Sequence, residues 1–150
     1  MPYLLNLKTD EQRKNYLISL FAEVYIKDII ERHKIERKDI LEDILNTLSS
    51  LISSLTNPTN ITNSIKSIKK EKLSSNTVSD YIEHCLDAFL ISEAKRYDVK
   101  GKHYFEYPNK YYFVDIGLRN ARLNFRQFDP GHIMENIVYN ELISRGYSVD

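Results

Sequence analysis

The chain of 150 residues has one cysteine and no tryptophan, and both shortages limit what it can be. The single Cys85 excludes an internal disulfide and a zinc site made of several cysteines, which fits a reducing cytoplasm. Eleven tyrosines and six phenylalanines supply the aromatic residues, a composition more typical of an AT-rich genome than of a particular function.

The sequence also lacks net charge and long apolar runs. Basic and acidic residues number 21 each, so the chain as a whole does not attract nucleic acid, membranes or acidic ligands. Any such partner must be recruited by a local patch. No apolar run approaches the roughly 18 residues that cross a bilayer, and the N-terminus has no signal-peptide pattern. We therefore expect a soluble, cytoplasmic protein with no membrane partner.

Apolar residues recur at helical spacing through the first 90 residues. The stretch "TDEQ" at 9–12 matches a capping box and predicts a long helix that runs to about Lys34. Further helices are predicted over 38–54, 61–70 and 76–90.

The pattern changes after Leu90. Aromatic and β-branched residues around the turn "KGK" predict a β-hairpin over 91–114. Asp115 then caps a short helix, and Asp129 with Pro130 opens a terminal helix. Three helices followed by a hairpin is the order of a winged helix-turn-helix. The predicted fold class is α+β, mostly helical, with a winged helix-turn-helix between a helical N-terminal lead and a C-terminal helical tail.

Four stretches follow one another along the chain: "VYIKDIIERHKI", "NTVSDYIEHCLDAFLISEAKRYDVKGK", "KYYFVDIGLRNA" and "GHIMENIVYNELISRGY". Together they resemble the C-terminal region, often labelled a domain of unknown function, of a large family of prokaryotic AAA+ ATPases. In that family a P-loop ATPase is followed by a winged-helix segment and a domain similar to the PD-(D/E)XK nucleases. The resemblance implies a lead at 1–36 after an absent ATPase module, a winged-helix domain at 37–114, and at 115–150 a linker with the first helix of a truncated nuclease-like domain.

The nucleotide-binding pattern "GxxxxGK[ST]" does not occur in this sequence, so the backbone cradle and lysine that hold ATP phosphates are absent. We expect the chain to be no enzyme and to need no cofactor. ATP and Mg²⁺ are implied only for the missing ATPase module. The chain is then a fragment of a larger protein, and the ATPase module of that protein is its first expected partner.

The resemblance connects Glu135 with catalysis, because this residue matches the metal-holding glutamate in the first helix of PD-(D/E)XK nucleases, with Glu141 in a supporting place. In that family the Asp and Glu-x-Lys elements that complete such a site follow this helix, which here places them beyond Asp150, so we assign no catalytic or metal residue. Glu135 is the vestige or the start of a nuclease-like site. We expect both carboxylates to pair with Arg or Lys, or to be exposed. One apolar face of the same helix is formed by Ile133, Met134, Ile137, Val138 and Leu142.

Basic residues gather where a winged helix meets DNA phosphates, on the helix before the turn, in the turn and on the hairpin. They are Lys66, Lys69, Lys70, Lys72, Lys95, Arg96, Lys100 and Lys102. Asn76 and Thr77 begin the would-be recognition helix, where base edges are usually met. An acidic stripe on the exposed side of that helix, formed by Asp80, Glu83 and Asp87, would instead repel phosphates.

Two interpretations stay open. The chain binds double-stranded DNA, or it is a protein-interaction or oligomerisation module that docks the ATPase, another subunit or a second copy of itself.

The remaining polar candidates favour structural roles. The histidines share no short ligand spacing with one another or with Cys85, so none is predicted to bind metal. They are His33, His84, His103 and His132. Cys85 lies on the buried face of its helix and is expected to be an inert core thiol. Asp115 and Arg119 are interpreted as a helix cap and a salt bridge.

Overall fold

The computed structural model describes residues 2–70, 72–95 and 108–150. After a short 3₁₀ helix, η1(Pro2–Asn6), the predicted long lead helix is confirmed. It consists of α1(Asp10–Leu20), the π-helical segment η2(Phe21–Ile26) and α2(Lys27–His33). The capping box is present: the Thr9 side chain accepts a hydrogen bond from the backbone N–H of Gln12, and the Gln12 side chain accepts one from the backbone N–H of Thr9. Lys34 ends the helix in the left-handed conformation, with φ of 50°.

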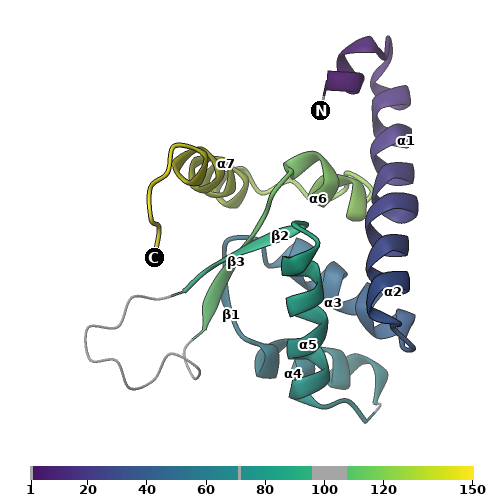
Figure 1. The fold of residues 1–150 in the computed structure, drawn as a ribbon, viewed down its shortest axis with the longest axis vertical. Helices are drawn as coiled ribbons and strands as arrows, with labels where there is room; N and C mark the ends of the chain where they lie inside the picture. The colour runs from purple at the N-terminus through teal and green to yellow at the C-terminus, as the bar shows by residue number, and fades with distance from the viewer. Residues whose placement is uncertain (1, 71, 96–107) are drawn as a thin grey trace.

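The next elements form a winged helix-turn-helix, which confirms the predicted mostly helical α+β fold (Figure 1). The helices are α3(Lys38–Ser50), α4(Pro58–Lys69) and α5(Ser75–Asp87), and the strands are β1(Leu55–Thr56), β2(Ile91–Ala94) and β3(Asn109–Phe113). The strands form an antiparallel sheet in the order β1-β3-β2, with Ile91 opposite Phe113. The strands β2 and β3 are the arms of the predicted hairpin, and residues 96–107 between them lie outside the described part of the chain.

Three predicted helix boundaries are wrong by three or four residues. The helix predicted over 76–90 ends at Asp87, shortly before Phe89 at φ of 53°. The helix predicted over 38–54 ends at Ser50, because the chain turns through Ser53 at φ of 60° and enters β1. The helix predicted from 61 begins at Pro58, since Asn57 caps it by accepting the N–H of Asn60 at 2.7 Å. Proline is favoured at the first helical position, where its missing N–H has no helical partner to lose.

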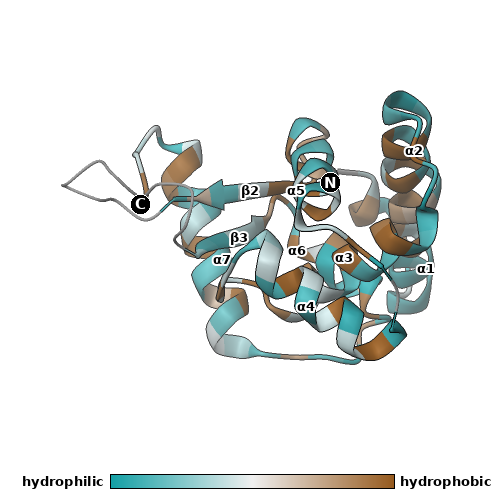
Figure 2. Cartoon of the chain, turned by 90° about the horizontal axis from the view of Figure 1, so that it is seen from below, coloured by the Kyte–Doolittle hydropathy of each residue, from teal (hydrophilic) through white to brown (hydrophobic). Residues whose placement is uncertain are grey.

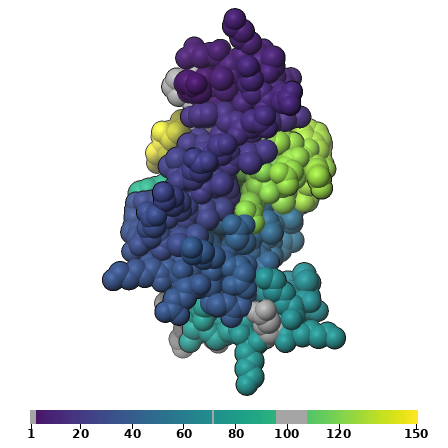
Figure 3. All heavy atoms as spheres, turned by 90° about the vertical axis from the view of Figure 1, so that its right-hand side faces the viewer, coloured from purple at the N-terminus to yellow at the C-terminus, as the bar shows by residue number. Residues whose placement is uncertain are grey.

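One hydrophobic core joins the lead, the winged helix and the short helix α6(Ile116–Arg122). Fully buried Ile29, Leu45 and Val78 come from the lead, α3 and α5, and Leu118 from α6 packs in the same cluster. Figure 2 shows hydrophobic residues as interrupted bands along the helices, as expected where each helix buries one face. In Figure 3 the lead runs along this side of the molecule with the light green segment of α6 beside it. The core therefore contains residues from both sides of positions 36 and 114, where the resemblance placed domain boundaries.

The last helix, α7(Pro130–Ser144), buries a face that shares Ile133 with the apolar face noted in the sequence but is otherwise different. It buries Ile133, Asn136 and Tyr139, whereas Met134 and Ile137 are 66% and 53% exposed. Asn136 accepts the N–H of Phe113 and donates to the C=O of Phe113, both at 2.8 Å. The inward face of α7 therefore combines the hydrogen bonds of Asn136 to β3 with apolar packing, including Tyr139 stacked on Tyr112 of β3.

No helix in the described ranges combines the length and apolar character needed to span a membrane.

Candidate nucleic-acid interface

The turn between α4 and α5 borders a hollow of about 630 Å³. Its lining is mostly basic and hydroxylic: Arg37, Ile40, Lys66, Lys72, Leu73, Ser74 and Thr77. Ser74 caps α5, because its hydroxyl accepts the N–H of Thr77 at 3.1 Å. The hollow therefore lies at the positive end of the α5 helix dipole.

The four lysines predicted near this turn divide into two groups. Lys69 faces α3, where its Nζ lies 2.5 Å from the Asp43 carboxylate and 3.6 Å from that of Asp39. Lys66, Lys70 and Lys72 are exposed, and no ion pair to another described residue neutralises them. The structure thus leaves these three lysines of the predicted set exposed, and two of them, Lys66 and Lys72, line the hollow.

Arg37, on the rim of the hollow, is oriented by Asp39. Its Nε and Nη2 donate to the two Asp39 oxygens at 3.0 and 2.8 Å. These bonds hold the pKa of Asp39 far below its ordinary value, against the opposing effect of burial. Because one carboxylate already takes two of its N–H groups, Arg37 brings less free charge to the hollow than the lysines do.

The start of α5 presents one exposed amide and one half-buried hydroxyl. Asn76 is exposed, whereas Thr77 shares a 2.8 Å hydrogen bond with the hydroxyl of Ser74. Further along α5 the predicted acidic stripe is exposed along its whole length, at Asp80, Glu83 and Asp87. The helix is therefore flanked by positive charge at its N-terminus and is negative along its outer side.

The basic residues predicted on the hairpin are only partly described. Lys95 directly follows β2, is exposed, and lies 3.7 Å from the Glu93 carboxylate. Arg96, Lys100 and Lys102 lie outside the described residues. The interface that can be described is therefore the α4–α5 turn.

Glu135 forms an ion pair with a basic residue, which was one of the two predicted outcomes for this carboxylate. Its Oε1 accepts from Lys110 Nζ at 2.7 Å and from the Tyr112 hydroxyl at 2.9 Å. Burial acts to raise the pKa of Glu135, but these two hydrogen bonds outweigh it and hold the pKa below the ordinary value. In the described ranges Glu135 belongs to no group of three possible metal-ligating residues. Glu141 is exposed and pairs with Arg145 at 2.7 Å.

Asp115 and Arg119 have structural roles, one of them different from the prediction. Asp115 caps α6 by accepting the N–H groups of Gly117 and Leu118. Arg119 is fully buried, and its partners are oxygens of uncharged groups rather than a carboxylate: Nε donates to Ser49 O at 2.8 Å and Nη1 to Gln127 O at 3.0 Å. The predicted salt bridge of Arg119 is therefore wrong in the described part of the chain. The thiol of Cys85 is buried, and this burial raises its pKa to about 12, as expected for an inert core residue.

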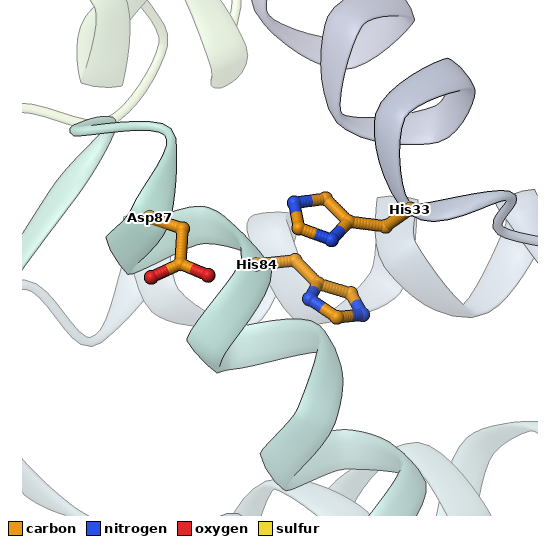
Figure 4. Close-up of side chains that lie close together, drawn as sticks. All are labelled: His33, His84 and Asp87. Atoms are coloured by element: carbon orange, nitrogen blue, oxygen red, sulfur yellow. The ribbon is translucent and has the colours of Figure 1, made fainter.

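The fold brings together three side chains that sequence spacing did not connect. His33 at the end of α2 stacks on His84 of α5, and Asp87 lies beside them (Figure 4). Only the i,i+3 spacing of His84 and Asp87 could have drawn attention to this place, because His33 is distant in sequence. The contact depends on how the lead packs against α5.

Element order, sheet order and the basic turn define a winged-helix domain. The chain belongs to the family described as a domain of unknown function, DUF8612, which matches residues 1–129. It is 35% identical to an uncharacterised protein of Haemophilus influenzae over 142 residues, which are 94% of this chain and 35% of that protein. It is 29% identical to an uncharacterised protein of Methanocaldococcus jannaschii over 145 residues, 95% of this chain and 32% of that protein.

The chain therefore spans about a third of the length of these relatives and corresponds to one part of larger prokaryotic proteins. No solved structure matches it significantly.

Proposed function

We propose that this chain is a non-catalytic winged-helix module of a larger, cytoplasmic prokaryotic AAA+ ATPase, and that it binds the phosphate backbone of double-stranded DNA at the α4–α5 turn. The observation that carries this proposal is the hollow at the N-terminus of α5, which Lys66 and Lys72 line, together with the exposed Lys70 between them in the sequence. Lysines and the N-terminus of a helix are both favourable for phosphate oxygens.

The acidic stripe on α5 limits how DNA can approach. Three exposed carboxylates would be forced against phosphates if α5 lay lengthwise in the major groove. Contact through the helix N-terminus keeps Asp80, Glu83 and Asp87 away from the backbone. We therefore expect weak binding with little dependence on base sequence, with a Kd of about 10⁻⁴ to 10⁻⁶ M at physiological salt.

Binding of a labelled duplex, followed by fluorescence anisotropy at several salt concentrations, tests this proposal. Three neutralised phosphates predict a slope of log K against log salt of about −2.7. The double variant Lys66→Glu/Lys72→Glu should lose most of the affinity, because both removed charges lie at the hollow.

The matched control is Lys8→Glu/Lys27→Glu, which changes the net charge equally at two exposed positions of the N-terminal lead. If the control weakens binding as much as the test variant, or if binding does not respond to salt, the α4–α5 turn is not a DNA contact.

The ATPase part of the proposal rests on the resemblance and on the length of the relatives, about three times that of the matched region. It is tested on the parent protein. A phosphate-binding loop upstream of this region and ATP hydrolysis by the full-length protein support the assignment. A parent sequence without such a loop refutes it.

A second candidate function, docking of another part of the parent protein, is favoured by the outer face of α7. Met134, Ile137 and Val138 are 66%, 53% and 51% exposed. Apolar side chains gathered on one exposed face are typical of surfaces that another domain covers.

Co-purification of this chain with the separately expressed remainder of the parent tests the docking function. Ile137→Asp/Val138→Asp should abolish the complex and leave duplex binding unchanged, whereas the lysine variants should do the reverse. A complex that survives the α7 substitutions contradicts docking through this face.

A further inference from the structure

The contact between the lead and α5 contains a cluster of nitrogen and oxygen ligands. His33 is the last residue of α2, His84 lies in the second half of α5, and Asp87 follows one turn later. The imidazole rings are stacked with centroids 3.8 Å apart and planes inclined by 13°. One ligand atom of each of the three residues lies within 4.8 Å of the other two. Figure 4 shows the rings one over the other with the Asp87 carboxylate to one side.

One of these ligand atoms is unsatisfied. His33 Nε2 is buried and has no hydrogen-bond partner among the described residues. Buried polar atoms are almost always paired, so an orphaned nitrogen beside a second imidazole calls for a specific explanation. A bound cation would provide that atom with a partner.

We propose that His33, His84 and Asp87 bind one divalent transition-metal ion, with Zn²⁺ the best fit to the ligand set. Two neutral imidazoles and one carboxylate are ligands that Zn²⁺ takes in three-ligand sites, with a solvent molecule in the fourth position. Asp87 is exposed, so solvent reaches the cluster from the side of this carboxylate. The hard ions Mg²⁺ and Ca²⁺, which prefer oxygen ligands, fit the two imidazoles poorly.

The protonation state of His84 is compatible with binding. Burial first, and then the neighbouring His33, lower the pKa of His84, while the nearby carboxylates of Asp80, Asp87 and Glu83 act in the opposite direction. A lowered pKa keeps the imidazole neutral near pH 7, and the neutral imidazole has the lone pair that a metal requires.

Binding requires a small rearrangement. Tetrahedral Zn²⁺ with bonds of about 2.0 Å places its ligand atoms about 3.3 Å apart, and the ligand atoms of this cluster lie within 4.8 Å of one another. Stacked rings also direct their lone pairs into nearly parallel planes, so at least one ring must turn about χ2. That torsion is broad and soft in histidine. The ion would then connect the lead to α5 and stabilise the folded chain by mass action.

The test is titration of the intact, chelator-treated chain with Zn²⁺ in a calorimeter, and with Co²⁺ followed by its visible absorption. We expect one ion per chain and a rise in unfolding temperature with Zn²⁺. Each of His33→Asn, His84→Asn and Asp87→Asn should weaken binding by about tenfold or more, since even second-shell changes at metal sites cost 10–100-fold. The control His132→Gln lies on α7 and should bind like the wild type.

Three results would overturn the proposal: no saturable binding, equal affinity in the wild type and all three site variants, or weakening in His84→Asn and Asp87→Asn but not in His33→Asn. The last would describe a local α5 site instead of one shared with the lead. Because Asp87 is exposed, its variant remains informative even if His33→Asn fails to fold.

Discussion

Replacing Asn136 by alanine should be among the most destabilising substitutions in α7. The side-chain amide of the fully buried Asn136 forms hydrogen bonds with both the N–H and the C=O of Phe113. Val114 N–H donates to Leu90 O, which places the polar groups of the adjacent Phe113 on the side of β3 away from β2. On that side β1 pairs only with Asn109 and Lys110. The Asn136 side chain therefore takes the place of a strand residue that β1 does not supply.

The magnitude follows from what each backbone group loses. In Asn136→Ala the buried N–H of Phe113 is left without its partner, at a cost of about 1–3 kcal/mol. The carbonyl keeps a 2.9 Å bond from Asn140, so its loss is about 0.5–1.5 kcal/mol. The sum is about 2–4 kcal/mol, which for a domain of this size lowers Tm by roughly 4–16 °C.

Urea unfolding of the two proteins, followed by circular dichroism, measures the difference. Asn140→Ala is the matched control, because Asn136 still satisfies Phe113 O and the other acceptor, Val114 O, belongs to an exposed residue. We expect the control to cost about 1 kcal/mol or less. Equal losses in the two variants would refute the idea that Asn136 completes the sheet.

Other substitutions test other contacts. Arg119→Ala should cost about 2–4 kcal/mol in urea unfolding, because the carbonyls of Ser49 and Gln127 lose their donor; a loss below about 1 kcal/mol would contradict this. Ser74→Ala should cost about 1 kcal/mol through loss of the α5 cap, and no change would argue against that cap. The pKa of Glu135 is lower in the folded state than its ordinary 4.5, so the stabilisation is present above pH 4.5 and is lost as pH falls through the folded pKa. The stability advantage of the wild type over Glu135→Gln should therefore shrink in acid, and a difference independent of pH would refute the contribution of the charged form.

Elements with strong local determinants could be predicted from the sequence. The capping box at Thr9 and the helical period behind it located the lead, and the apolar period of α5 identified a buried helix face. Helix boundaries were wrong where local patterns compete. Residues 51–54 continue an apolar period, yet the chain leaves the helix there because Ser53 and β1 pair with β3. Tertiary hydrogen bonding overrides local periodicity in this segment.

The candidate sites depended more on tertiary structure. Lysine composition predicted a basic turn, but only the packing of α4 on α3 shows that Lys69 is engaged with Asp39 and Asp43. Most of the apolar face of α7 noted in the sequence is exposed, whereas Asn136, which hydropathy does not favour, is fully buried. The cluster of His33 and His84 joins residues distant in sequence, so no spacing rule could have found it.

The asparagines of α7 have a geometric consequence. Hydrogen bonds are directional, whereas apolar contact is not, so a helix held by Asn136 and Asn140 cannot roll about its own axis on the sheet. The outer face of α7, with Met134, Ile137 and Val138, is therefore held at one fixed angle to β3. A domain that covered this face would have its orientation set by Asn136 and Asn140, together with the contact of Glu135 to Lys110 and the stacking of Tyr139 on Tyr112.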